Sequence, residues 1–233
     1  MDNINQLKHF LFFGRKKIIF LSLNQKKDIS LNREISIVDT DINKKFYLLE
    51  KFLDQNIFEI EKKLANHVKD ISLIIDHDDF LTINLSTVQN CKNFFDHTND
   101  VSNLFINIRS SIINDMNNYE ITHMLINKFI IDGKDYSLIP DKLNFDNIFL
   151  EISFICLKKI FSQNLKKIFS KYQISVNKIF NFNYVHNSKK DDERNLFIAA
   201  ENLMNGSNPN EIFLIDKSPS NKGFFEKFFN FFS

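Results

Sequence analysis

Glycine, proline, tryptophan and cysteine are all scarce in this sequence of 233 residues, which has four Gly, three Pro, no Trp and two Cys. So few glycines leave little material for the Gly-rich loops that hold phosphate groups, and the sequence contains no GxxxxGK[ST], GxGxxG or GxSxG motif. Cys91 and Cys156 are far apart and form no CxxC pair, so neither a disulfide framework nor a zinc cluster is expected. The scarcity predicts a protein of a reducing compartment without the usual enzyme motifs.

The chain also has no excess of charge and no long apolar run. Its formal net charge is +1, and no basic patch is interleaved with aromatic residues, so nucleic acid is not an expected partner. No stretch reaches the roughly 18 apolar residues that cross a bilayer. The start, MDNINQLKHFLFFGRKK, lacks the features of a signal peptide. We therefore expect a cytoplasmic protein, one that can still contact a membrane surface.

Side chains able to do chemistry are few. The stretch DHDD, Asp76–Asp79, offers suitable metal ligands. It separates two predicted strands, however, and no second cluster supplies further ligands, so a solvated acidic turn is favoured. His123 lies within a predicted strand without a visible Ser or Cys partner, which is typical of a core or edge histidine. We expect no catalytic residues, no metal and no cofactor, and interpret the chain as non-enzymatic.

The periodicity of the apolar residues predicts an α+β fold. From Phe46 to Val68 they recur every three or four positions, which predicts a long helix with Asp41 or Asn43 as its N-cap. The other predicted helices lie at 98–116, at 159–172 and in a segment reaching Asn205. Alternation or short apolar runs predict strands at 17–23, 29–38, 71–76, 80–87, 119–131, 147–157, 174–185 and 211–216.

Two pairs of residues predict where elements end. Asp132-Gly133 is a turn pair that stops the strand at 119–131. Gly206 is expected to stop the last helix, and Asp191 or Asp192 to cap its start. These local signals support a compact chain up to residue 216.

The C-terminal sequence differs in kind from the rest. Residues 217–223, KSPSNKG, have the composition of a linker. On a helix, the six phenylalanines of residues 224–233 fall within about 160° of arc, and the polar residues fill the other side. They are Phe224, Phe225, Phe228, Phe229, Phe231 and Phe232. Lys222 and Lys227 would suit anionic lipid. A membrane surface is the favoured partner of this segment, ahead of docking on the protein's own core or in a groove of a partner protein.

A series of anchors in a fixed order lies in EITHMLINKFIIDGKDYSLIPDKLNFDNIFLEISFICLKKIFSQNLKKIFSKYQISVNKIF, residues 120–180. They are His123, Asp132, Gly133, Pro140, Leu150, Glu151, Asn164 and Val176. Their order and spacing resemble the insertion subdomain of the FtsA family, actin-like bacterial cell-division proteins that tether the division ring to the cytoplasmic membrane. The sequence departs from that family at Ile126, where Pro is usual, and near Gln173, where Gly is usual.

The resemblance implies a domain organisation. Residues 1–77 and 174–216 would form a partial actin-like (ribonuclease H-like) subdomain, and residues 78–173 a strand–helix–strand–strand insertion subdomain. Gly14 and Lys17 match the family's DxGxxK phosphate loop, but apolar residues occupy its acidic position. The family's second phosphate loop is missing, so the resemblance implies no ATP binding.

The function implied is that of a divisome adaptor at the septum, attached to the inner face of the membrane by residues 224–233. Such an adaptor acts through protein contacts, including self-association, made by the insertion subdomain. In the family FtsZ docks on a second lobe, for which this chain is too short, so direct FtsZ binding is not implied. Two alternatives stay open. One is a small nucleotide-binding actin-like protein that uses Gly14 and Lys17; the other is a pilus-assembly relative, because those proteins share the insertion.

Overall fold

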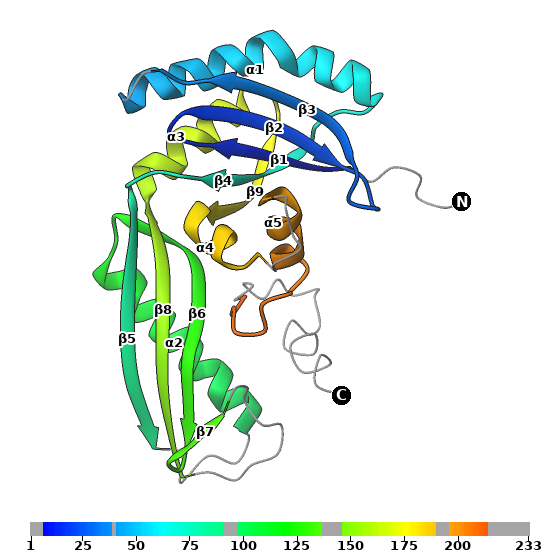
Figure 1. Cartoon of the computed structure of the whole chain (residues 1–233). Coiled ribbons are helices and arrows are strands. Elements are labelled where there is room, and N and C mark those ends of the chain that lie inside the picture. Colours follow the sequence, from blue (N-terminus) through cyan, green and yellow to red (C-terminus); the bar gives the residue numbers. More distant parts are fainter. Residues whose placement is uncertain (1–6, 39–40, 91–96, 137–145, 190–195, 214–233) are drawn as a thin grey trace. The chain divides into compact units, whose positions relative to one another are not determined.

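The computed structural model describes residues 7–38, 41–90, 97–136, 146–189 and 196–213. It divides the chain into two compact units (Figure 1). Unit 1 comprises Met1–Leu81 and Leu157–Ser207, and unit 2 comprises Thr82–Cys156 and Asn208–Ser233. Each unit has its own β-sheet with helices packed on it, which confirms the predicted α+β class.

Unit 1 contains a five-stranded sheet in the order β3-β2-β1-β4-β9. Its strands are β1 (Lys8–Phe13), β2 (Lys17–Leu23), β3 (Ile29–Ser36), β4 (Asp70–Ile75) and β9 (Ser175–Asn181). β2 pairs antiparallel with both β1 and β3, whereas β4 pairs parallel with both β1 and β9. The three parallel strands therefore end at the same edge of the sheet.

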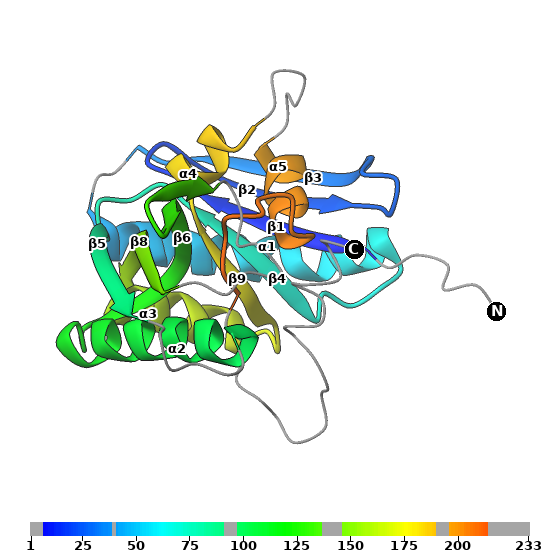
Figure 2. The ribbon, with the colours of Figure 1, turned by 90° about the horizontal axis from the view of Figure 1, so that it is seen from below.

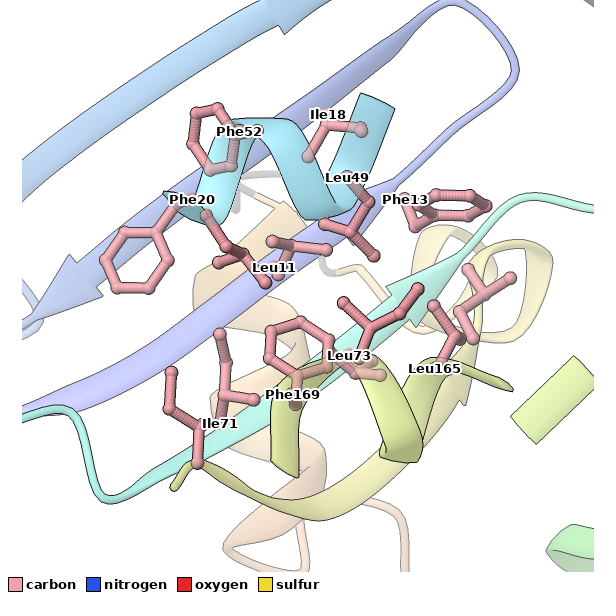
Figure 3. Packing of buried hydrophobic residues seen from close by; sticks show 14 of the residues in the cluster. Leu11, Phe13, Ile18, Phe20, Leu49, Phe52, Ile71, Leu73, Leu165 and Phe169 are labelled. Carbon is pink, nitrogen blue, oxygen red and sulfur yellow. The ribbon is translucent and has the colours of Figure 1, made fainter. Parts of the chain in front are cut away.

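Helices α1 (Ile42–Leu64) and α3 (Lys159–Ser170) cover one face of this sheet (Figure 3). The apolar residues of both helices recur every three or four positions and meet the alternate side chains of the strands. The side chains that fill the layer between them include Leu11, Phe13, Ile18, Phe20, Leu49, Phe52, Ile71, Leu73, Leu165 and Phe169. The Asp41 side chain accepts a hydrogen bond of 3.0 Å from the Lys44 backbone N–H, which makes it the N-cap of α1, as one of the two predicted candidates.

Helices α4 (Phe182–Asn187) and α5 (Leu196–Met204) cover the opposite face (Figure 2). They bury the other set of alternate side chains, among them Phe10, Phe12, Leu21 and Phe180. Unit 1 thus has three layers with a sheet in the middle. α5 ends as predicted, because Gly206 has a φ of +80° and its N–H donates to the carbonyl of Leu203.

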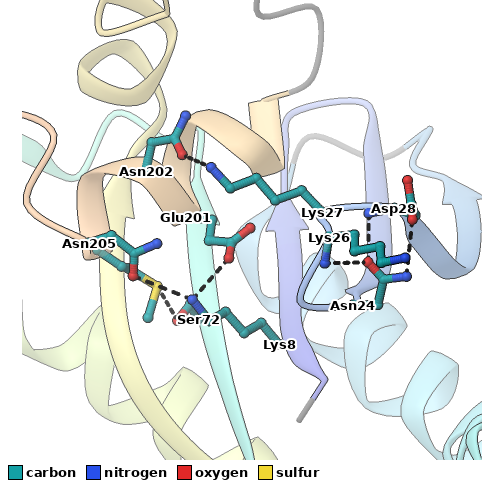
Figure 4. A network of polar contacts seen from close by, with 10 residues as sticks. Lys8, Asn24, Lys26, Lys27, Asp28, Ser72, Glu201, Asn202 and Asn205 are labelled. Carbon is teal, nitrogen blue, oxygen red and sulfur yellow. Dashed lines mark hydrogen bonds and ion pairs between the residues drawn. The ribbon is translucent and has the colours of Figure 1, made fainter. Parts of the chain in front are cut away.

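Polar contacts fix α5 to the strands beneath it (Figure 4). Lys8 Nζ lies 2.9 Å from Oε1 of Glu201, a residue only 3% exposed. Lys27, in the turn between β2 and β3, donates to the side chain of Asn202. One end of each contact is on α5 and the other on the sheet's antiparallel half, so the helix is held in position by directional bonds as well as by burial.

Unit 2 contains a four-stranded sheet in the order β5-β8-β6-β7. Its elements are β5 (Phe80–Asn90), α2 (His97–Asp115), β6 (Tyr119–Ile131), β7 (Lys134–Tyr136) and β8 (Asn147–Lys158). α2 packs on one face of the sheet through Phe105 and Ile108. Asp132 and Gly133 both have positive φ, 46° and 80°, and form the turn between β6 and β7, as their sequence predicts.

The structure differs from the sequence prediction at several elements, among them the short strand β7, which was not predicted. β1 was not predicted, because residues 8–13 are buried on both faces and so show no alternation. The strand predicted at 174–185 stops at Asn181, whose side chain caps α4. The strand predicted at 211–216 is a single bridge between Glu211 and Leu125, and residues 214–216 lie outside the described ranges. Helix α3 packs in unit 1, whereas the predicted insertion subdomain, 78–173, included it.

Candidate functional site

The candidate site lies where the parallel strands of unit 1 end. β1 ends at Phe13 and β4 at Ile75, and these two residues are paired in register. The N–H of Asp76 donates to the carbonyl of Phe13 at 3.0 Å, which holds the loop after β4 against the end of β1. In open sheets with parallel strands, ligands bind at the carboxyl ends of the strands. The turn after β1 and the loop Asp76–Asp79 therefore form the edge of the sheet at which a ligand would bind.

The turn between β1 and β2 contains both residues of the predicted phosphate-loop remnant. The Gly14 N–H donates to the carbonyl of Lys17 at 2.9 Å, which closes the hairpin. A Cβ at Gly14 would lie 2.4 Å from Cε1 of Phe12, so the packed ring of Phe12 requires glycine here. Lys17 Nζ lies 3.4 Å from Oε1 of Glu34 on β3. Both residues thus have a structural partner in the hairpin.

The loop after β4 is an acidic turn whose charges are paired. Arg15 bridges two carboxylates, with Nε 3.1 Å from Asp76 Oδ1 and Nη2 2.5 Å from Asp78 Oδ1. Lys158 Nζ lies 2.5 Å from Asp79 Oδ1. The hydrogen bonds that Arg15 donates to the carboxylates of Asp76 and Asp78 raise the pKa of Arg15. Within the described ranges, no group of three or more His, Cys, Asp or Glu side chains is placed to hold a metal ion.

His77 is the one titratable ring in this loop. Its ring centroid lies 4.8 Å from that of Phe161 on α3, and Nδ1 accepts a hydrogen bond of 3.3 Å from the backbone N–H of Asp79. Burial lowers the pKa of His77 despite the attraction of Asp79, and the positive charge of Lys45 lowers it further. Nδ1 also lies 3.2 Å from Oδ2 of Asp79, so Asp79 presents both a donor and an acceptor to this nitrogen.

Lys45 has no side-chain partner among the described residues. It lies in the first turn of α1, is 4% exposed, and its charge is felt at His77. No described residue forms an ion pair or a hydrogen bond with its amine. The sequence alone does not distinguish Lys45 from its neighbour Lys44. The two lysines differ in burial, which depends on how α1 packs on the sheet. Lys45 is the cation at this edge that could meet an added anion.

The other predicted chemical residues lie in the core of unit 2. His123 is 2% exposed, and its Nδ1 lies 2.8 Å from Oε1 of Glu211, which confirms a core histidine. Glu211 is 88 residues away in the sequence, so no local pattern could have indicated this pair. Cys156 is buried as well, and desolvation raises the pKa of its thiol to about 11. At neutral pH this thiol is protonated and unreactive.

The predicted linker and membrane-binding segment, 217–233, lie outside the described residues. This includes Lys222, Lys227 and the six phenylalanines of the segment. Within the described part of the chain, none of the helices combines the length and the apolar character needed to cross a bilayer.

Comparison with known protein families and with curated proteins finds no match to this sequence. Solved structures do match. The PilM-PilN type IV pilus biogenesis complex is similar over 76% of this chain and 48% of that chain, with 5% identity and a TM-score of 0.47. The cytoplasmic domain of EpsL, an inner membrane component of the type II secretion system of Vibrio cholerae, is similar over 80% and 58%, with 7% identity and a TM-score of 0.39.

A third similar structure is a Bacteroides thetaiotaomicron protein described as having an actin-like ATPase fold and unknown function. It matches over 78% of this chain and 57% of that chain, with 12% identity and a TM-score of 0.31. The chain therefore spans about half the length of the structures it resembles.

Proposed function

We propose that this protein is a non-enzymatic adaptor that attaches to the inner face of the cytoplasmic membrane and acts through protein contacts. The observation that carries the proposal is the separation of polar and apolar residues in the segment from Phe224 to Phe232. Fully burying one phenylalanine is worth about 1.5–3 kcal/mol, so partial insertion of six still leaves a substantial affinity for lipid. No other stretch of the chain gathers six Phe in ten residues.

The paired charges at the strand ends support the non-enzymatic part of the proposal. Asp76, Asp78 and Asp79 each contact a basic side chain. The ring of Phe12 occupies the space beside Gly14. A phosphate group at this edge would lie near three carboxylates. The lysine of the hairpin, Lys17, is paired with Glu34 on β3. An adaptor needs the sheet and helices of unit 1 only as a rigid body, which this arrangement provides.

The finer assignment is to the divisome, as an FtsA-like protein that works at the septum. It rests on the ordered anchors between His123 and Val176 and on the linker followed by an amphipathic segment. A pilus- or secretion-assembly protein is the alternative, since similar solved structures come from such assemblies. Both assignments share the membrane-attached adaptor, and they differ in the protein partner.

A second candidate function, nucleotide binding, is favoured by one observation. Lys45 is a buried cation close to the ends of the parallel strands and without a side-chain partner among the described residues. A phosphate oxygen would be a suitable partner for its amine. Direct measurement of ATP binding separates this candidate from the adaptor.

Liposome flotation tests the membrane attachment. We expect the full-length protein to float with vesicles containing anionic lipid, and a variant ending at Asn221 to stay at the bottom of the gradient. The matched control is Phe225→Ser/Phe229→Ser, which keeps the length and charge of the segment and should also fail to float. Equal flotation of the full-length and shortened proteins, or flotation of neither, would contradict the proposal.

The thermal transition of both variants is the folding control. If residues 222–233 bind lipid and do not pack on the protein's own core, removing them should leave the melting temperature unchanged. A clear fall in melting temperature would mean that the segment packs on the protein's own core, which is the competing interpretation of its apolar face.

A further inference from the structure

The outer face of the α1/α3 layer is the side of these two helices that points away from the sheet of unit 1. Its exposed residues include Tyr47, Lys51 and Phe58 on α1 and Ile160, Gln163 and Lys167 on α3. Tyr47 and Phe58 are separated by about three helical turns, so both side chains project from the same side of α1. Leu49 and Leu53, on the opposite side of the helix, are fully buried against the sheet.

Three large apolar side chains on this outer face are exposed to solvent. Tyr47 is 66% exposed, Phe58 75% and Ile160 63%. The two helices are neighbours, since Glu50 on α1 is paired with Lys171, the residue after α3. A single exposed apolar residue is ordinary, whereas three on one helical layer of the same unit indicate a surface that contacts something else.

The α3 side of this face is free of negative charge. Residues 152–190 contain eight lysines and no aspartate or glutamate, in a chain whose formal net charge is only +1. Three of these lysines, Lys159, Lys166 and Lys167, lie in α3. The inner side of α3 is buried through Leu165 and Phe169, so its positive charge is confined to the side that points away from the sheet.

The acidic residues of α1 do not compensate this charge, because each already has a partner outside the helix. The partners are Lys171 for Glu50, Tyr172 for Asp54, Arg33 for Glu59 and His67 for Glu61. By contrast, the amines of Lys51, Lys159 and Lys167 form no ion pair or hydrogen bond with a described residue. The outer face therefore combines exposed apolar side chains with positive charge that has no partner within unit 1.

Lipid with anionic headgroups matches both properties of the face. Lysines interspersed with exposed aromatic and aliphatic side chains are typical of surfaces that lie in the membrane interface. The two aromatic residues come from α1 and the excess of charge from α3, so the combination arises from packing and no single segment of the sequence contains it.

The length of the tail favours lipid over other anionic partners. Ten residues, 214–223, separate Phe213 from Phe224, and they span at most about 36 Å. Once the C-terminal segment is in the membrane, the folded part of the chain is held within that reach of the headgroups. A weak contact then forms often, because the effective concentration of lipid is high.

We propose that the outer face of the α1/α3 layer is a second membrane-contact surface, which lies on anionic headgroups and orients unit 1. The lysines contact headgroup phosphates, and the exposed apolar side chains enter the interfacial region. This contact adds to that of the C-terminal segment and is too weak to replace it. The inference rests on the proposed membrane attachment. It leaves α4 and α5, on the opposite face of the sheet, turned toward the cytoplasm.

Charge reversal tests the surface in the full-length protein. Lys51→Glu/Lys167→Glu changes one exposed lysine on each helix of the layer. Lys26→Glu/Lys134→Glu, in the turn after β2 and on β7, is the matched control with the same change of net charge. Binding is measured by co-sedimentation with vesicles of phosphatidylglycerol and phosphatidylcholine in equal parts, and with vesicles of phosphatidylcholine alone.

We expect the α1/α3 variant to need at least about tenfold more of the anionic vesicles than the control for half-maximal binding, and the two to bind phosphatidylcholine equally. Equal binding of the two variants to anionic vesicles would overturn the inference while leaving membrane attachment in place. Absence of vesicle binding by wild type would contradict the attachment itself and the inference with it.

A fluorescent reporter tests the contact without removing charge. The chain has no tryptophan, so Phe58→Trp introduces a single emitter at an exposed position of the outer face. We expect its emission to shift to the blue and to be quenched when vesicles with brominated acyl chains and phosphatidylglycerol are added. The control Asn183→Trp, on an exposed position of α4, should show neither change. An unchanged Phe58→Trp spectrum on bound vesicles would overturn the inference and favour an acidic protein as the partner of this face.

Discussion

At the scale of single residues, the three described glycines show what local sequence can and cannot predict. Gly133 and Gly206 both have a φ of +80°. From the neighbouring residues, Gly133 was predicted to lie in a turn and Gly206 to end a helix. Gly14 is different, because the ring of Phe12 leaves no room for a side chain. A Cβ at position 14 would lie 2.4 Å from Cε1 of that ring. That requirement depends on how a ring is packed within unit 1, which no short motif records.

Replacing Gly14 tests whether packing or a ligand explains the glycine. We expect Gly14→Ala to lower the free energy of unfolding by about 1–3 kcal/mol, because the added methyl must displace the buried ring of Phe12. Urea unfolding at neutral pH measures the change. The matched control is Gly133→Ala, where nothing lies within 4 Å and only the positive φ is unfavourable.

A double variant shows whether Phe12 is the cause. In Phe12→Leu/Gly14→Ala the cost of the alanine should be smaller than in the wild-type background, since the clashing ring atoms are gone. The cost of Gly133→Ala should be the same in both backgrounds. Additive costs of Phe12→Leu and Gly14→Ala would show that the glycine is explained by something other than this contact.

At the scale of elements, apolar periodicity and the capping residue predicted α1, whereas β1 was not predicted because it is buried along almost its whole length. One face of the helix is exposed to solvent and the other is buried, so apolar residues recur every three or four positions in its sequence. β1 lies between α1 and α3 on one side and α4 and α5 on the other, so its burial pattern does not alternate. The end of β9 was missed because Phe182, Tyr184 and Val185 of the six-residue helix α4 continue the run of apolar and aromatic residues beyond its cap, Asn181.

The N-cap of α1 provides a test at this scale. Asp41→Ala removes the acceptor for the Lys44 N–H and should lower the free energy of unfolding by about 1 kcal/mol. Asp41→Asn retains an oxygen acceptor and should cost only a few tenths of a kcal/mol. Chemical unfolding of the two variants side by side measures the difference. Equal costs would indicate that charge near the helix start, and not the cap, is what matters.

At the scale of the whole molecule, the sequence predicted the class and most elements but not the long-range contacts. The parallel pairing of β1, β4 and β9, the position of α3 in unit 1 and the pair of His123 with Glu211 all join segments far apart in the chain. Hydrophobic periodicity contains no information on such partners. The candidate site was found through Gly14 and Asp76–Asp79, whereas its buried cation, Lys45, depended on burial.

Titration calorimetry with ATP and Mg²⁺ tests the nucleotide-binding candidate on the full-length protein. We expect no saturable heat, because three paired carboxylates surround the strand ends and Lys17 is bound to Glu34. If saturable binding occurs, Lys45→Met should weaken it strongly, while the exposed control Lys51→Met should not. Saturable binding that depends on Lys45 would make nucleotide binding part of the function.

The segment just before the C-terminal tail has a mechanical consequence. The Ile212 N–H donates to Met124 O at 2.8 Å and the Ile126 N–H to Asn210 O at 2.9 Å, while Glu211 is locked to His123. A load pulling on the residues after Phe213 is therefore taken up by β6 before any of it reaches α5. These two backbone hydrogen bonds and the buried pair lie between the tail and α5 in the chain, so they resist such a load before the helix does. The pairing of residues 210–212 with β6 would therefore limit how much of a force applied to the C-terminal tail is transmitted along the chain to α5.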